Sequence, residues 1–273
     1  MNRTRVPPEP GRRDILVLDT ITALSPGDAG AVVVSASHGG VSSGRFALRV
    51  PLAGVFFNDA GVGKDDAGIR SFDELDAAGV PAATFGCMSA RIGIGDDSFQ
   101  NGMVSHCGRR ALELGLSAGM TVSEAANRLA RQAGVSIAAS PGETSLSRSR
   151  LDLVHGTVHL LDSVSMMDEL DAGQAVVTGS HGGLISASFV TAHRPSVVSF
   201  SDAGVGKDDA GIAALKPLDD AGIASFCVSH NSARIGDPLD MIEAGVVSVA
   251  NALAARRGVL VGMPVSRAVS LFL

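Results

Sequence analysis

The chain is built from a duplicated sequence. Three polar segments each occur twice, 143 residues apart: SHGG from Ser37 and Ser180, DAGVGKDDAGI from Asp59 and Asp202, and SARIG from Ser89 and Ser232. An identity of eleven consecutive residues does not arise by chance. Residues 15–130 and 158–273 therefore align without a gap as two copies of one unit.

This repeat differs from a solenoid, whose periods are shorter and whose copies are more numerous. It favours two similar lobes related by a pseudo-two-fold axis, as expected when a homodimer becomes one chain. The predicted organisation is an N-terminal extension over 1–14, a first α/β repeat over 15–130, a connector over 131–157 and a second α/β repeat over 158–273. Within the connector, the Ser-, Gly- and Pro-containing stretch 139–150 predicts an exposed linker.

Short apolar runs alternate with helical segments in the first copy. The runs 31–34, 55–57 and 80–85 each end at one of the repeated segments. Continuous apolar strands separated by helices are typical of parallel sheets. The sequence therefore predicts an α/β fold with mainly parallel strands in each lobe.

Helices are predicted over 69–78, 100–116 and 121–129. The first stops at Gly79, a residue suited to the left-handed conformation that ends many helices. The last opens with Thr121 and Glu124, which have the spacing of a capping box.

Composition excludes several classes of partner. The formal net charge is −6 and the chain has no Trp or Tyr, so we expect no nucleic-acid partner. No apolar run approaches the ~18 residues of a membrane span. The basic start is not followed by an apolar h-region, so no signal peptide is predicted. We therefore expect a cytoplasmic protein without membrane contact. Its three cysteines lack paired spacing and are expected as reduced thiols, and its 45% apolar content makes a homo-oligomer plausible.

The repeated segments are candidates for a functional site because loops after parallel strands meet at one edge of a sheet, where ligands bind. Between the copies, core positions change, as from Phe56 to Ser199, whereas the polar loop residues do not. The candidate catalytic residues are His38, His181, Asp59, Asp202, Ser180 and His230. The candidate substrate-binding residues are Gly39, Gly40, Gly182, Gly183, Lys64, Lys207, Ser89, Arg91, Ser232 and Arg234.

Each segment also has a purely structural interpretation. SHGG offers an acid–base histidine and backbone donors, or simply a tight turn; its Ser and His are adjacent and point to opposite faces of an extended segment. GVGKD lacks the first glycine and the Ser or Thr of a phosphate-binding P-loop. Its Lys64 or Lys207 presents a cation, or forms an internal ion pair with Asp. The arginine of SARIG can clamp a carboxylate or phosphate, or pair with a neighbouring Asp.

The copies differ just before SARIG. His230 of the second copy has Cys87 at the equivalent place in the first. We therefore expect the active site nearer the second copy. Three other histidines, His155, His159 and His193, show no constellation and are expected at the surface.

These features favour an enzyme acting on a small anionic, carboxylate-bearing metabolite, most simply a hydrolase of an amide, lactam or ester bond. A serine or a water molecule is the nucleophile, and the SHGG backbone stabilises the oxyanion. Three alternatives stay open: an isomerase or lyase acting by proton abstraction, a metal-assisted hydrolase, and a non-catalytic ligand-binding protein. No cofactor is expected, apart from a divalent metal in the second alternative.

Overall fold

The computed structural model describes residues 2–132 and 146–273. The chain divides into two compact units. The first unit comprises Met1–Ala60, Gly68–Ser145 and Gly206–Asp208, and the second comprises Gly61–Ala67, Leu146–Val205 and Asp209–Leu273. A short piece of each DAGVGKDDAGI segment thus belongs, by its contacts, to the unit built mainly from the other repeat.

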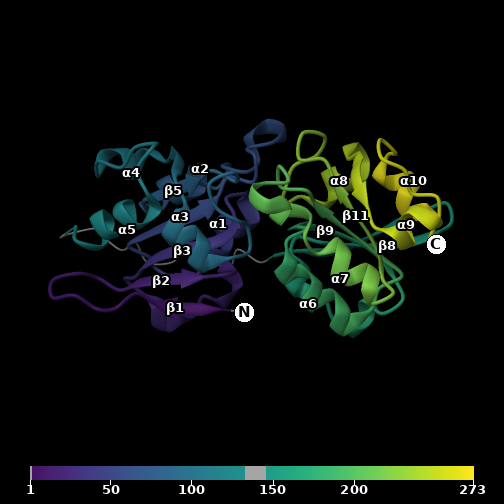
Figure 1. The fold of residues 1–273 in the computed structure, drawn as a ribbon, viewed down its shortest axis with the longest axis horizontal. Coiled ribbons are helices and arrows are strands. Elements are labelled where there is room, and N and C mark those ends of the chain that lie inside the picture. Colours follow the sequence, from purple (N-terminus) through teal and green to yellow (C-terminus); the bar gives the residue numbers. More distant parts are fainter. Residues whose placement is uncertain (1, 133–145) are drawn as a thin grey trace. The chain divides into compact units, whose positions relative to one another are not determined.

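Each unit contains a six-stranded mixed sheet with interleaved helices (Figure 1). In the first, the spatial order follows the sequence: β1 (Arg3–Arg5), β2 (Ile15–Leu18), β3 (Val32–His38), β4 (Gly54–Asn58), β5 (Ala82–Phe85) and β6 (Val104–Cys107). In the second, the strands are β7 (Arg148–Leu153), β8 (Gly156–Leu161), β9 (Ala175–His181), β10 (Val197–Ser201), β11 (Ala224–Val228) and β12 (Val247–Ala250). Neighbouring strands are parallel from β2 to β5 and from β8 to β11, and the two edge strands of each sheet are antiparallel. The predicted two-lobed α/β fold is confirmed.

Helices cover both faces of each sheet. Those of the first unit are α1 (Val41–Ala47), α2 (Phe72–Ala77), α3 (Gly95–Asn101), α4 (Arg109–Glu113) and α5 (Val122–Ala130), and those of the second are α6 (Leu184–His193), α7 (Leu215–Asp220), α8 (Pro238–Ala244), α9 (Ala252–Arg256) and α10 (Val265–Ser270). Short 3-10 turns are η1 (Ile21–Ala23), η2 (Pro26–Asp28), η3 (Lys64–Asp66), η4 (Val164–Met166), η5 (Glu169–Asp171) and η6 (Lys207–Ile212).

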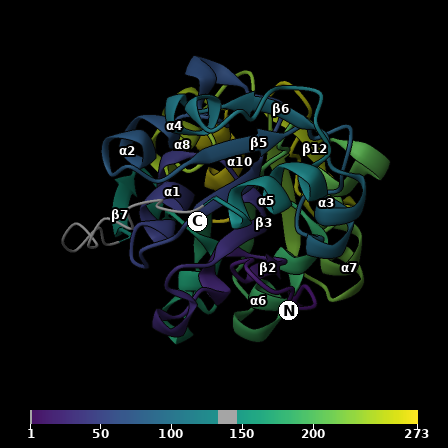
Figure 2. The same ribbon diagram turned by 90° about the vertical axis from the view of Figure 1, so that its left-hand side faces the viewer.

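Every strand from β2 to β5 is buried along its whole length because both of its faces carry apolar cores. One core of the first unit joins the sheet to α5, and the other joins it to α1 and α2. Figure 2 shows α3 and α5 lying against β3. The second unit repeats this plan, with α8 and α10 on one face and α6 and α7 on the other. Burial on two faces explains the continuous apolar runs in the sequence.

Two local predictions hold and one is wrong. Helix α2 ends before Gly79, which has φ 76°. Thr121 caps α5 by accepting a hydrogen bond from the Glu124 backbone N–H, which is one half of the predicted capping box, while the Glu124 side chain lies 3.8 Å from Arg128. The single helix predicted over 100–116 is instead the end of α3, the strand β6 and the short α4. Gly102 and Gly108 separate these elements and interrupt the helical pattern.

The sequence did not predict the two outer strands. β1 lies within the expected N-terminal extension and pairs with β2, and β7 begins inside the expected connector and pairs with β8. Polar and charged residues dominate both strands, as is usual at sheet edges. The rest of the connector prediction, at 133–145, lies outside the described residues.

The DAGVGKDDAGI loops have an unusual backbone. Ala60, Gly61, Val62 and Gly63 have φ of 49°, 74°, 64° and 72°, and the matching residues of the second repeat have 49°, 74°, 61° and 74°. Left-handed conformation costs about 1–2 kcal/mol for an ordinary residue and is exceptional for Val. The two copies therefore keep the same sequence over a loop that few sequences can adopt.

The first glycine of each SHGG segment allows two backbones to approach closely. A Cβ atom on Gly182 would lie 2.7 Å from the carbonyl oxygen of Gly211 and 2.7 Å from Cys227 Sγ. A Cβ atom on Gly39 would lie 2.5 Å from the carbonyl oxygen of Gly68. These glycines therefore fix the SHGG turn against the following loop of the same unit.

We predict that Gly182→Ala lowers the free energy of unfolding by about 1–3 kcal/mol, because the added methyl group overpacks the turn. Urea denaturation measures this change. Gly27→Ala is the matched control, since its Cβ would have only Ser25 Oγ nearby, at 3.9 Å. Equal effects of the two substitutions would contradict the packing argument.

Candidate functional site

The repeated polar residues lie at the carboxyl ends of the parallel strands. His181 is the last residue of β9, Asp202 directly follows β10, and His230 lies two residues beyond the end of β11. In the first unit, His38 is the last residue of β3 and Asp59 directly follows β4. Parallel strands end on the same side, so each unit gathers these side chains at one sheet edge.

Asp202 and His230 form a hydrogen-bonded pair in the second unit. His230 Nδ1 lies 2.8 Å from Asp202 Oδ1, and the His230 backbone N–H donates to the same oxygen at 3.0 Å. The Asp202 side chain is 5% exposed, whereas that of His230 is 20% exposed. Nε2 of His230 has no hydrogen-bond partner among the residues that the structure describes. An imidazole held in this way has one fixed nitrogen and one available for chemistry.

The environment of Asp202 favours its charged form. Burial disfavours the carboxylate, but the side-chain and backbone hydrogen bonds from His230 outweigh it and lower the pKa of Asp202. An ionised Asp202 accepts a hydrogen bond from Nδ1–H of His230, which leaves Nε2 as the acceptor when the ring is neutral. Gly61 packs against this ring: a Cβ atom there would lie 3.2 Å from Nε2, a tight contact, and its φ of 74° also favours glycine.

The first unit lacks this pair. There, Asp59 accepts a hydrogen bond of 2.9 Å from the backbone N–H of Cys87, at the position equivalent to His230. The backbone contact is kept while the imidazole is replaced by a thiol. The two units therefore share a framework but differ in the group that could transfer a proton.

The histidines of the SHGG segments are buried and take part in local turns. The Gly183 backbone N–H donates to Nδ1 of His181 at 3.0 Å, and Gly40 donates to Nδ1 of His38 at 3.1 Å. Burial lowers the pKa of His181 to about 4, so this ring is neutral at pH 7 with its hydrogen on Nε2. His181 is thus suited to donate a hydrogen bond rather than to accept a proton.

The candidate serines have structural partners. The hydroxyl of Ser180 accepts a hydrogen bond from the Val164 backbone at 2.9 Å. Ser89 and Ser232 each donate to a backbone carbonyl and accept from a backbone N–H, at distances of 2.7–3.0 Å. These hydroxyls hold turns together, so a water molecule is the simpler nucleophile.

In the second unit, Asp240 binds both cationic candidates. Lys64 Nζ lies 2.7 Å from Asp240 Oδ1, and Arg234 lies 3.2 Å from the same oxygen. Arg234 also pairs with Asp65 at 3.1 Å. The Lys64 backbone N–H donates to the carbonyl of His230 at 2.8 Å, which ties this loop to the Asp202–His230 pair.

The first unit repeats the arrangement around Asp97. Arg91 Nε lies 3.0 Å from Asp97, and Lys207 Nζ lies 3.2 Å from it. The Lys207 backbone N–H donates to the carbonyl of Cys87 at 2.9 Å. All four cations predicted to hold a substrate are therefore paired with carboxylates inside their units.

Asp97 and Asp240 are the residues that sequence reasoning missed. They stand 143 residues apart, so the repeat itself contained the signal. Partial burial disfavours their charged forms, but hydrogen bonds from Arg91 to Asp97 and from Lys64 to Asp240 outweigh it and lower both pKa values. Both carboxylates thus stay ionised and anchor the neighbouring loops.

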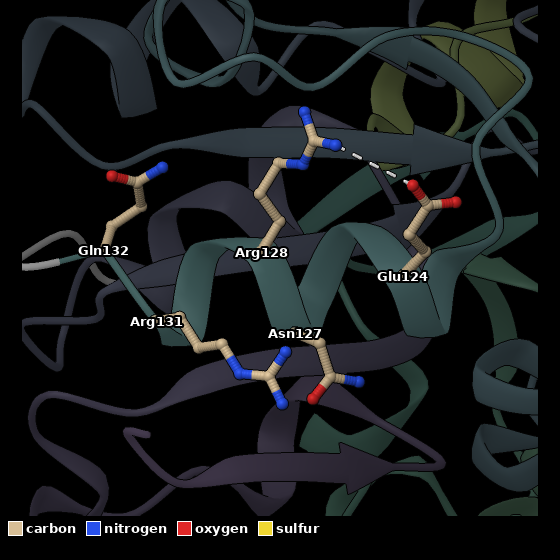
Figure 3. A pocket seen from close by; sticks show the side chains of 5 residues that line it. All are labelled: Glu124, Asn127, Arg128, Arg131 and Gln132. Atoms are coloured by element: carbon tan, nitrogen blue, oxygen red, sulfur yellow. Dashed lines mark ion pairs between the residues drawn. The ribbon is translucent and has the colours of Figure 1, made fainter. Parts of the chain in front are cut away.

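Two surface hollows lie away from these loops. One of about 440 Å³ is lined by Glu124, Asn127, Arg128, Arg131 and Gln132 (Figure 3). Its arginines are already paired, Arg128 with Glu124 at 3.8 Å and Arg131 with Glu9 at 2.6 Å. The other, of about 470 Å³, includes His159, which is 5% exposed and so contradicts the surface position expected for it.

Among residues 2–132 and 146–273, no group of three or more His, Cys, Asp or Glu side chains is arranged to hold a metal ion. The metal-assisted alternative therefore has no ligand cluster in this part of the chain. No helix in the same residues is long and apolar enough to cross a membrane. Cys87, Cys107 and Cys227 form no disulfide within the described residues, and burial raises the pKa of the Cys107 and Cys227 thiols.

Comparisons with protein-family models, curated proteins and solved structures found no match. The functional argument therefore depends on the site itself.

We predict that Asp97→Asn lowers the free energy of unfolding at pH 7 by about 3 kcal/mol, because it leaves two cations without their shared carboxylate. The pKa of Asp97 is lowered in the folded state, so its contribution is full above the ordinary carboxyl pKa and is lost as the pH falls below it. Stability of the variant should accordingly fall less between pH 5 and pH 3, near the ordinary Asp value of about 3.9.

Urea denaturation across this pH range measures both effects. Asp73→Asn is the control, since the Asp73 side chain is 85% exposed. An Asp97→Asn variant with the stability and the pH profile of the Asp73→Asn variant would show that the ion pairs do not anchor the loop.

Proposed function

We propose that this chain is a small-molecule hydrolase that cleaves an amide, lactam or ester bond in a carboxylate-bearing metabolite. The observation that carries the proposal is the Asp202–His230 pair at the carboxyl edge of the second sheet, with a Nδ1–Oδ1 distance of 2.8 Å. In this proposal His230 is the general base. Its ring is oriented by a buried, ionised carboxylate, as general-base catalysis by histidine requires.

Water is the proposed nucleophile. Nε2 of His230 would remove a proton from water as the oxygen attacks the carbonyl carbon, and would return that proton to the leaving group. His181 is neutral at pH 7 because its pKa is about 4, and it lies beside Ser201 in the sheet register. We assign to Nε2–H of His181 the donation of a hydrogen bond to the developing oxyanion, because the backbone N–H groups of Gly182 and Gly183 already donate to the Ser201 carbonyl and to His181 Nδ1.

The proposed ligand for the substrate carboxylate is Arg234. Its side chain is 41% exposed, more than Lys64 at 27%, and it shares Asp240 with that lysine. An anion that approaches Arg234 competes with Asp65, whose side chain is 51% exposed, and with Asp237, whose side chain is 38% exposed. Arg91 and Lys207 have the equivalent position in the first unit, where Cys87 replaces the base.

We infer that catalysis resides in the second unit. The pseudo-two-fold relation of the repeats, self-association of the chain and its cytoplasmic location are predictions from the sequence.

We predict that His230→Ala lowers kcat/KM by about 10²–10⁴-fold, the usual contribution of a general base. Asp202→Asn should also lower it, because the amide no longer fixes the imidazole tautomer. The measurement is hydrolysis of a panel of small amides, lactams and esters that carry a carboxylate. His155→Ala, at an exposed histidine, is the control and should retain full activity.

Hydrolysis that survives unchanged in His230→Ala would overturn the assignment of the base. Deuterium uptake from heavy water next to the substrate carboxylate, without bond cleavage, would instead assign the pair to an isomerase or lyase.

We predict that a small dicarboxylate such as succinate raises the Tm of the full chain. A ligand at 100 times its Kd adds about 2.7 kcal/mol to stability. Arg234→Ala should abolish the shift, whereas Arg267→Ala, on the exposed side of α10, should preserve it. A shift that is the same in both variants would contradict a role for Arg234 in anion binding.

A further inference from the structure

A second hollow in the second unit has features of a ligand site. It has a volume of about 470 Å³ and is lined by Arg150, Asp152, Thr157, His159, Leu170 and Gln174. Strands β7 and β8 supply four of these residues on one face of a hairpin, where Arg150 is directly opposite His159 and Asp152 is opposite Thr157. Directly opposed residues of an antiparallel pair have Cβ atoms about 4.5–5.5 Å apart, so the side chains of each pair lie close to each other.

His159 is the buried polar group of this hollow. It is 5% exposed, and its Nδ1 lies 2.7 Å from Oδ1 of the fully buried Asp171. Its Nε2 has no hydrogen-bond partner in the part of the chain that the structure describes. An imidazole that donates from Nδ1 presents Nε2 as an acceptor. A buried acceptor that lines a hollow favours a ligand that donates a hydrogen bond.

The first unit builds the equivalent place without a histidine. The first unit has the corresponding ion pair, between Arg3 and Asp28, but has Leu16 at the position of His159. In the second unit, Arg148 pairs with Asp171 at 2.6 Å in the same way. The histidine is thus an addition to a framework that is complete without it.

The hollow contains one positive and one negative side chain, Arg150 and Asp152, which do not pair with each other. Arg150 forms no ion pair within the described residues, and Asp152 is held by the hydroxyl of Thr157 at 2.7 Å without a cationic partner there. A guanidinium suits a carboxylate, and a carboxylate beside an imidazole nitrogen that accepts hydrogen bonds suits an ammonium group. Leu170, 60% exposed, supplies an apolar contact at the rim. A dianion would be repelled by Asp152, and a dication by Arg150.

We propose that this hollow binds a small zwitterion of the α-amino acid type. Its carboxylate binds Arg150, its ammonium group donates to Asp152 and to His159 Nε2, and an apolar side chain packs on Leu170. This site is separate from the proposed hydrolytic centre, so either proposal can fail without the other.

The test is titration of the full chain with L-leucine, followed by the C2–H proton resonance of His159 in NMR spectra. That resonance is assigned by its absence from His159→Leu, which carries the residue found at this place in the first unit. We expect L-leucine to shift this resonance with saturation. Calorimetry should show affinity at least about tenfold weaker for Arg150→Ala and Asp152→Ala, each of which loses a charged hydrogen bond.

Two analogues test the zwitterion directly. 4-Methylpentanoate lacks the ammonium group of leucine and 3-methylbutylamine lacks its carboxylate, so each should bind at least about tenfold more weakly than leucine. Arg150 and Asp152 are exposed, and their variants are expected to fold even if His159→Leu does not. Absence of leucine binding, equal binding of either analogue, or unchanged affinity in Asp152→Ala would overturn the proposal.

Discussion

The local architecture of both repeats depends on two buried carboxylates, Asp97 and Asp240. Each accepts one hydrogen bond from the backbone N–H of the arginine in its own SARIG segment and another from the lysine of a DAGVGKDDAGI loop. Each also forms an ion pair with the side chain of that arginine. Those loops contain non-glycine residues in left-handed conformation, at a cost of about 1–2 kcal/mol each. A strained loop persists only when its surroundings hold it firmly, and these ion pairs provide that hold.

The same pairing limits what the cations can do. A lysine or arginine that already neutralises a buried carboxylate attracts a substrate anion less strongly than a free one, because the pair has little net charge. The Asp202–His230 pair differs in this respect, since its carboxylate orients a ring whose second nitrogen is available. The proposed chemistry therefore depends on the imidazole. Lys64 stabilises the loop around it, and Arg234, whose side chain is 41% exposed, is the cation proposed to bind a substrate carboxylate.

The sequence predicted the two-lobed α/β fold, the buried parallel strands and some of the helix ends. Burial of the strands on both faces made their apolar runs visible, and Gly79 and Thr121 marked helix ends through backbone chemistry that is local. Strands β1 and β7 were not predictable because edge strands have one paired side and carry charged residues. An internal ion pair was one of two interpretations of Lys64 and Lys207, but the partner carboxylates were not predictable, because they are 176 and 110 residues away in the chain.

From the sequence alone, the identity of the polar segments in the two repeats indicates a catalytic or binding role. The structure supplies a different cause for much of this identity. DAGVGKDDAGI is kept because its backbone is left-handed, and the SHGG glycines and SARIG arginines are kept because they pack or pair. Such constraints act equally on both copies. A function carried by one copy has to appear where the copies differ, as at Cys87 and His230 or at Leu16 and His159. In both pairs the second repeat has an imidazole bound to a buried carboxylate, on a framework that the first repeat builds without one. Differences between the repeats are therefore the better guide to activity in this chain.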